Sequence, residues 1–126
     1  LQWYKRLSAA ASESEVERIA AELIDRFGPL PAESEELVRL MVVKAIGRSL
    51  AIRGVEISSR RLVFHLAPDS RINPDGVVEI IREERGEVQL TDDLKIKVTP
   101  RNGETNGSVG AIRFLHRLCA CGTNPP

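Results

Sequence analysis

The sequence predicts an α+β fold with a small, mostly antiparallel sheet that helices cover on one side. In the first part of the chain, over residues 13–50, apolar residues recur at helical spacing. Farther on, two segments of short alternating runs predict two β-hairpins, with one helical segment between them and another after them. Two helices, a hairpin, a helix, a hairpin and a helix are typical of an α+β fold that begins with a helical pair.

The first predicted helix covers residues 13–27. Ser12 followed by Glu15 forms a capping box, in which side chains satisfy the free N–H groups at a helix start. Gly28 suits the left-handed position just after a helix end. The apolar residues at helical spacing, which we expect to face the core, are Val16, Ile19, Ala20, Leu23 and Phe27.

The second predicted helix runs from Pro31 to about Leu50. Proline is favoured in the first turn of a helix, and acidic residues are stabilised there by the helix dipole. Because the linker from Gly28 to Pro31 is short, we expect the two helices to form a compact pair. One apolar stripe consists of Leu37, Leu40, Val43, Gly47 and Leu50, and Met41, Val42 and Ile46 widen it.

The second half of the chain alternates between strand and helix patterns. Asn73 and Pro74 mark the start of a helix, and Gly86 marks its end. In the second hairpin Leu94, Ile96 and Val98 alternate with lysines and are expected inside. The predicted elements are strands 55–58 and 61–66, a helix from 73 to 86, a hairpin over 87–100, a flexible loop over 101–110 and a short helix over 111–120.

Length and charge restrict the class of protein. A chain of 126 residues predicts one domain, and a formal net charge of zero argues against a free-standing nucleic-acid binder, although a local basic patch is compatible with it. No apolar run approaches the length of a membrane span, and a cytoplasmic location is the default. Because the chain begins without Met in a helix-like segment, residues 1–7, we expect it to be a fragment of a longer protein.

No set of residues predicts a catalytic residue, a metal site or a cofactor site. The loop over residues 101–110 lacks the lysine that a phosphate-binding Walker A loop needs. His65 and His116 have no nucleophile or carboxylate partner in a recognisable order. Cys119 and Cys121 are two ligands at most, too few for a structural zinc site. The fragment is therefore expected not to be an enzyme.

Glu22 and Asp25 pose a problem of charge. They lie three residues apart and share a helix face, where Arg18 and Arg26 are spaced to pair with Glu22. Asp25, however, lies in the last helical turn, where a carboxylate costs about 0.3–1 kcal/mol. Two interpretations remain open from the residues alone: a solvated charged face, or an acidic surface that contacts a partner.

The sequence also resembles a known family over nearly its whole length. The matching segments resemble the C-terminal domain of the bacterial transcription-repair coupling factor family (Mfd), and about the last twenty residues depart from it. These segments are YKRLS (4–8), EVERIAAELIDRFGPLP (15–31), LAIRGVE (50–56), INPDGVVEII (72–81) and LKIKV (94–98).

The resemblance implies a regulatory role for residues 1–126 as a single C-terminal domain. Members of the family are ATP-dependent DNA translocases that displace stalled RNA polymerase and recruit excision repair through UvrA. ATP and Mg would bind in upstream motor domains, and polymerase and DNA would bind through other domains. The C-terminal domain would dock on the N-terminal UvrB-like module of the same chain, mask its UvrA-binding surface and keep the translocase autoinhibited.

Carried over by position, the family's acidic interdomain contacts are Glu22 and Asp25, and Arg26 either flanks the contact or neutralises Asp25. An alternative is an accessory nucleic-acid-binding domain that assists the motor. Its candidate residues are Arg60, Arg61, Arg82 and Arg85, together with Trp3 and Tyr4, which would otherwise pack onto the helical pair.

Overall fold

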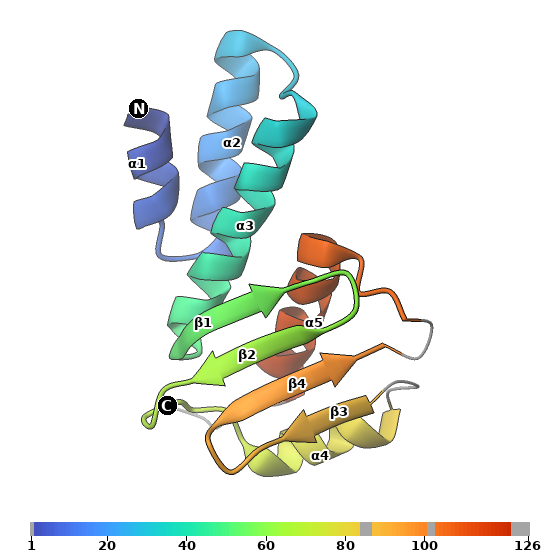
Figure 1. Cartoon of the computed structure of the whole chain (residues 1–126). Coiled ribbons are helices and arrows are strands. Elements are labelled where there is room, and N and C mark those ends of the chain that lie inside the picture. Colours follow the sequence, from blue (N-terminus) through green and yellow to red (C-terminus); the bar gives the residue numbers. More distant parts are fainter. Residues whose placement is uncertain (1, 84–86, 101–102, 122–126) are drawn as a thin grey trace.

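The computed structural model describes residues 2–83, 87–100 and 103–121. Within these residues the chain forms helices and strands in the order predicted, preceded by one further helix (Figure 1). The elements are α1 (Gln2–Ala9), α2 (Glu13–Phe27), α3 (Ala32–Ser49), β1 (Ile52–Ile57), β2 (Leu62–Leu66), α4 (Pro74–Glu83), β3 (Glu87–Leu90), β4 (Lys95–Thr99) and α5 (Gly107–Cys121).

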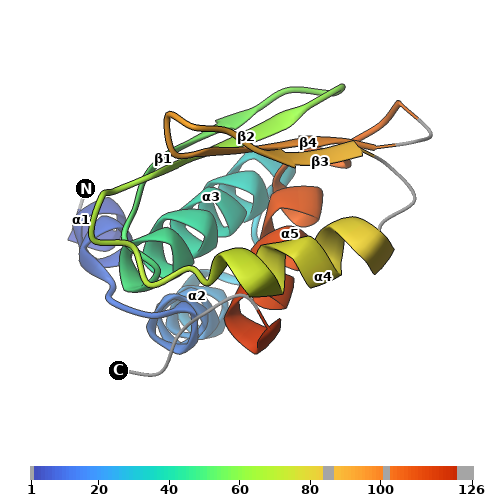
Figure 2. The ribbon, with the colours of Figure 1, turned by 90° about the horizontal axis from the view of Figure 1, so that it is seen from below.

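The strands form one antiparallel sheet in the order β1-β2-β4-β3. The hairpins β1–β2 and β3–β4 join through the pairing of β2 with β4. Figure 2 shows the helices on one face of this sheet and the other face uncovered. The predicted α+β class, with two hairpins in an antiparallel sheet covered on one side, is therefore confirmed.

The core lies between the covered face of the sheet and helices α3, α4 and α5. Phe64 at the centre of β2 is fully buried, and its ring stacks on that of Phe114 from α5, with 5.2 Å between ring centroids. Ile96 of β4 and Ile80 of α4 are also fully buried. Residues of every layer therefore contribute to one continuous core.

The helix signals in the sequence correspond to contacts in the structure. The Ser12 hydroxyl accepts a hydrogen bond from the Glu15 N–H at 3.2 Å, and α2 begins at Glu13. Gly28 ends this helix with φ of 85°, in the region that favours glycine. The predicted bounds of the first helix, 13–27, are confirmed.

The helix-like opening segment is a regular helix, α1. Two expectations about where elements begin were wrong. Strand β1 begins at Ile52 rather than at Val55, and Ile52 pairs with Leu66 before a bulge. The last helix begins at Gly107 rather than at residue 111, because Thr105 fixes the preceding turn. The Thr105 hydroxyl is buried and donates to the Ser58 carbonyl at 2.6 Å, so the loop is anchored at this point.

Two residues that were predicted to be buried are exposed. Leu94 lies in the turn before β4 with φ of 61°, so it does not share the inner face of Ile96 and Val98. Leu40 of α3 is 40% exposed, because this part of the stripe borders a surface groove instead of the core. Gly86, the predicted end of the third helix, lies outside the described residues.

A partly buried polar contact joins α3 to the start of α5. The Ser108 hydroxyl is buried and donates to the Glu36 carboxylate at 2.5 Å, and the Arg39 guanidinium donates to the same carboxylate at 3.0 Å. The hydrogen bond from Ser108, followed by the interactions with Arg39, lowers the pKa of Glu36 from its ordinary value of 4.5 despite partial desolvation. Glu36, predicted only to favour the helix start, therefore also connects two helices.

Ser108→Ala should lower the free energy of unfolding by about 1 kcal/mol at neutral pH, because one buried hydrogen bond is lost. A carboxyl whose folded pKa is depressed stabilises the fold above its unfolded pKa, here 4.5, and that contribution is lost as pH falls through the folded value. Urea unfolding at pH 7 and at pH 3 should therefore show a smaller difference between Ser108→Ala and wild type at the lower pH. An equal or larger difference at pH 3 would contradict the role given to Glu36.

Candidate interdomain contact site

The predicted contact residues lie near one end of a projecting helical hairpin. Helices α2 and α3 pack side by side, and the turn that joins them extends away from the sheet (Figure 1). Glu22, Asp25 and Arg26 lie in the last two turns of α2, close to this turn. All three residues therefore lie in the part of α2 that projects from the sheet.

Glu22 has a partner that the sequence pattern did not indicate. Its carboxylate pairs with the guanidinium of Arg6 from α1 at 2.8 Å, and both side chains are about half exposed. The helical spacing had suggested Arg18 or Arg26 as the partner. The sequence indicated a helix-like opening segment, but not that this segment, α1, packs beside α2. Such an exposed pair contributes only about 0–1 kcal/mol to stability.

Arg26 lies against an aromatic side chain. Its guanidinium is 5.8 Å from the centre of the Trp3 ring, and that of Arg6 is 4.8 Å from the same ring. Trp3 also meets Phe27 edge to face, with 6.2 Å between centroids. Packing of Trp3 onto the helical pair is therefore confirmed, whereas Tyr4 is exposed. Of the two roles expected for Arg26, flanking the contact fits this position better than neutralising Asp25.

Asp25 is exposed, and its side chain forms no hydrogen bond or ion pair with any residue that the structure describes. Its position in the last turn places the charge near the negative end of the α2 dipole, which costs about 0.3–1 kcal/mol. Neither Arg18 nor Arg26 offsets this cost with an ion pair. Asp25 is thus an available carboxylate on a projecting helix end.

Apolar side chains are exposed in the same turn. Phe27, which the sequence pattern predicted to be in the core, is 69% exposed, and Ile24 is 46% exposed. The pattern was wrong for Phe27 because this turn extends beyond the packed part of the hairpin, where the ring meets Trp3 edge to face and is otherwise largely exposed. An exposed aromatic residue next to an available charge is typical of side chains that anchor protein interfaces.

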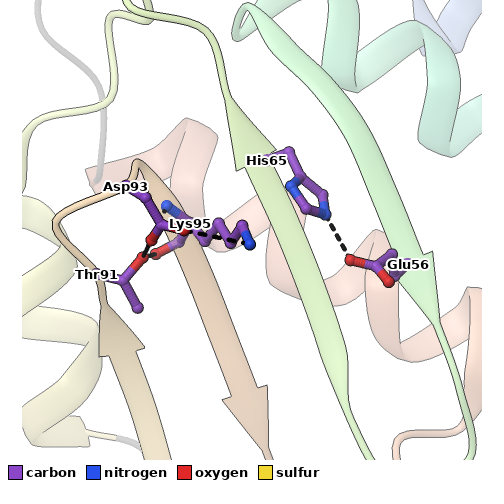
Figure 3. A network of polar contacts seen from close by, with 5 residues as sticks. All are labelled: Glu56, His65, Thr91, Asp93 and Lys95. Carbon is purple, nitrogen blue, oxygen red and sulfur yellow. Dashed lines mark hydrogen bonds and ion pairs between the residues drawn. The ribbon is translucent and has the colours of Figure 1, made fainter.

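The uncovered face of the sheet carries a second group of polar side chains (Figure 3). His65 of β2 contacts the Glu56 carboxylate of β1 at 2.5 Å, and Lys95 pairs with Asp93 at 3.2 Å. The hydrogen bond with His65 is the largest cause of the lowered pKa of Glu56. The first pair joins neighbouring strands, and the second lies within the turn before β4 and the start of that strand. Both are largely exposed, so the group fits a solvated sheet face.

The remaining candidates are dispersed over the molecule. His116 of α5 contacts Glu13 of α2 at 2.7 Å, far from His65 in the fold. The Cys119 residue is exposed, and partial desolvation of its thiol is the main cause that raises the pKa of this group, while the side chain of Cys121 lies outside the description. Among the residues described, no group of three His, Cys, Asp or Glu side chains is arranged to hold a metal ion.

The basic residues of the alternative are also separated. Arg60 and Arg61 are exposed in the β1–β2 turn. Arg82 on α4 pairs with Glu79 at 3.2 Å, and Arg85 lies outside the described residues.

None of the helices that the structure describes combines the length and the apolarity of a membrane span.

Comparisons with known proteins agree with the resemblance seen in the sequence. A family model, the TRCF domain, matches residues 1–77. The transcription-repair-coupling factor of Myxococcus xanthus is 36% identical over 123 residues, which are 96% of this chain and 10% of that protein. The corresponding factor of Escherichia coli K12 is 30% identical over 119 residues, 94% of this chain and 10% of that protein. The chain thus spans about a tenth of the length of these relatives.

A solved structure is similar over the whole fold. The crystal structure of a C-terminal domain of transcription-repair coupling factor superposes with a TM-score of 0.75 at 16% sequence identity. The match covers 96% of this chain and 79% of that one. At this identity the likeness establishes the shared fold, including the helical hairpin and the sheet.

Proposed function

The chain belongs to the TRCF domain family, as a C-terminal domain of transcription-repair coupling factor, and on this premise we propose that it is a non-catalytic regulatory domain. It docks on the N-terminal UvrB-like module of the same protein and masks the UvrA-binding surface there. In this docked state the parent, an ATP-dependent DNA translocase that displaces stalled RNA polymerase and recruits nucleotide excision repair, is held inactive. The domain itself needs no cofactor.

The proposal rests mainly on one observation: Asp25 is exposed at the end of α2, and its side chain has no partner among the described residues. A carboxylate at the unfavourable end of a helix, exposed and without an internal partner, is stabilised when an arginine of another domain approaches it. Local rules of sequence and structure are broken most often at functional sites. Phe27, exposed in the same turn, supplies an apolar contact beside the charge.

Glu22 has a different part in this contact. Because Arg6 already pairs with it, an arginine from the partner must share this carboxylate or displace Arg6. Glu22 therefore contributes less net attraction than Asp25 does. Arg26, held against Trp3, flanks the contact without cancelling the charge of Asp25.

A modest, polar interface is sufficient for this role. Interfaces between domains of one chain are commonly small and polar, which permits release. Covalent linkage in the parent gives an effective concentration up to the millimolar range, so a weak interface remains occupied. Competition with UvrA can then open the interface without any chemical step in this domain.

The proposal is tested by titrating this chain with the separately produced UvrB-like module and then adding UvrA. We expect saturable binding that UvrA displaces, because both bind the same surface of the module. Binding that persists in the presence of saturating UvrA would contradict masking. No binding to the module at low ionic strength would contradict docking itself.

One observation favours the second candidate, an accessory nucleic-acid contact. Arg60 and Arg61 are adjacent and exposed in the β1–β2 turn, and neither side chain forms a described ion pair. If this function is correct, the chain binds duplex DNA with an affinity that falls steeply with salt. Salt-sensitive DNA binding that Arg60→Glu together with Arg61→Glu abolishes, without binding to the module, would replace the docking proposal.

A further inference from the structure

A surface groove lies between helix α3 and the edge strand β1, on different elements from Asp25. Its volume is about 320 Å³. Leu40 from α3 and Val55 and Ile57 from β1 provide apolar lining, and all three are partly exposed. Val55 and Ile57 pair with Phe64 and Leu62, so they continue the apolar face of the sheet to its edge.

The strand beside this groove has an open edge. β1 is the first strand in the order β1-β2-β4-β3 and has β2 as its only strand neighbour. Within the described chain, residues 52–57 form no backbone hydrogen bond beyond their pairing with β2. An edge strand of this kind presents free N–H and C=O groups to which an extended segment can be added.

Cations surround the groove without carboxylate partners. Lys44, Arg48 and Arg53 line it, and no Asp or Glu does. No ion pair of these three side chains is found within residues 2–83, 87–100 and 103–121; Arg48 donates only to the Ala10 carbonyl, at 3.5 Å. The groove is therefore positively charged in a chain whose net charge is zero.

At two glycines in the lining the structure leaves room for a Cβ atom. At Gly47 an added Cβ would meet Ile52 at 3.7 Å, an ordinary contact, and at Gly54 the nearest atom would be 4.0 Å away, on His65. Neither glycine has a positive φ. Glycine inside a helix or strand weakens it, and one common reason to keep it is the close approach of a ligand or another backbone.

We propose that this groove binds an extended acidic peptide segment, which adds to β1 as a fifth strand. Its apolar side chains pack on Leu40, Val55 and Ile57, and its carboxylates pair with Lys44, Arg48 and Arg53. A peptide fits better than a nucleic acid, because the lining is largely apolar and contains no aromatic residue for base stacking. This surface is independent of the docking proposed for α2.

The probe is a fluorescent, end-capped peptide of alternating valine and aspartate, about eight residues long. Its binding to the full chain is followed by anisotropy at low salt. We expect saturable binding that falls at least about tenfold when Lys44→Glu and Arg53→Glu are combined. The matched control, Arg71→Glu with Arg113→Glu, makes the same change of net charge at exposed sites outside the groove and should leave the affinity within about twofold.

Further probes separate the parts of the proposal. A peptide N-methylated at alternate residues should not bind if strand addition is correct. Three outcomes would overturn the proposal. They are an equal loss of affinity in both charge-reversal pairs, undiminished binding of the N-methylated peptide, and no binding of the valine–aspartate peptide. Binding of single-stranded DNA to the same residues, with no binding of the peptide, would overturn it in favour of a nucleic-acid groove. Circular dichroism confirms that each variant is folded.

Discussion

Replacing Asp25 with lysine is expected to weaken binding of the chain to the UvrB-like module by at least about 30-fold. The substitution removes a carboxylate that we propose pairs with an arginine of the module, and it leaves two like charges facing each other. Loss of one partner from a charge pair at an interface commonly costs about 2–5 kcal/mol. The fold itself should be unaffected, since Asp25 is exposed and forms no described side-chain contact.

The matched control is Glu17→Lys on the same helix. Glu17 is also exposed, and it lies about 12 Å from Asp25 along the helix axis, more than two turns nearer to the start of α2. This control makes the same change of net charge, so it should alter affinity by no more than about twofold. Isothermal titration at two salt concentrations measures both variants. Equal weakening by both substitutions would show that net charge, and not this site, determines the interaction.

Glu22→Lys is a less specific variant. It removes the ion pair with Arg6 and places a second cation beside that guanidinium, which also disturbs the contact of α1 with α2. A loss of docking in this variant therefore has two causes. The affinity of Asp25→Lys can be compared with that of the double variant Glu22→Lys with Asp25→Lys. The difference separates the direct contribution of the Asp25 charge from the effect of displacing α1.

Replacing Phe64 with alanine is expected to lower the free energy of unfolding by about 3–5 kcal/mol. Phe64 is fully buried at the centre of the sheet, and its ring stacks on Phe114. Deleting the ring leaves a cavity between β2 and α5 and removes the stacking on Phe114. For a domain of this size that loss is a large part of the total stability.

Phe27→Ala provides the comparison, because it deletes the same atoms from an exposed position. The ring is 69% exposed and touches Trp3 at one edge, so the expected loss of stability is about 1 kcal/mol. Urea unfolding followed by circular dichroism measures both variants. Similar losses for Phe27→Ala and Phe64→Ala would contradict the assignment of the core. The exposed variant, by contrast, should weaken docking on the module.

Local signals in the sequence were sufficient for much of the fold. The capping box at Ser12 and the glycine at position 28 determined the bounds of α2, because both act through contacts within one helix turn. Alternation in Ile96 and Val98 identified the inner face of β4. The two hairpins were correctly predicted for the same reason, whereas their order in the sheet depends on contacts between β2 and β4.

The missed features depend on contacts between segments far apart in the sequence. Helical periodicity gave Phe27 a core position, but the length of the projecting hairpin, set by tertiary packing, leaves it exposed. The Arg6 partner of Glu22 required the orientation of α1, and the early start of α5 required the contact of Thr105 with Ser58. The poor placement of Asp25, a local signal, left an acidic contact surface as one of two interpretations, and the family resemblance assigned Glu22 and Asp25 to the contact.

The most direct test of the account is a map of the contact surface by NMR. The ¹⁵N-labelled chain is titrated with the unlabelled UvrB-like module, and amide shifts are followed residue by residue. The account predicts that the largest changes cluster at the end of α2, over residues 22–27, and in α1 beside it, while amides of β3 and α4 do not change. Changes confined to the sheet or to α4, with the end of α2 unaffected, would contradict docking through Asp25.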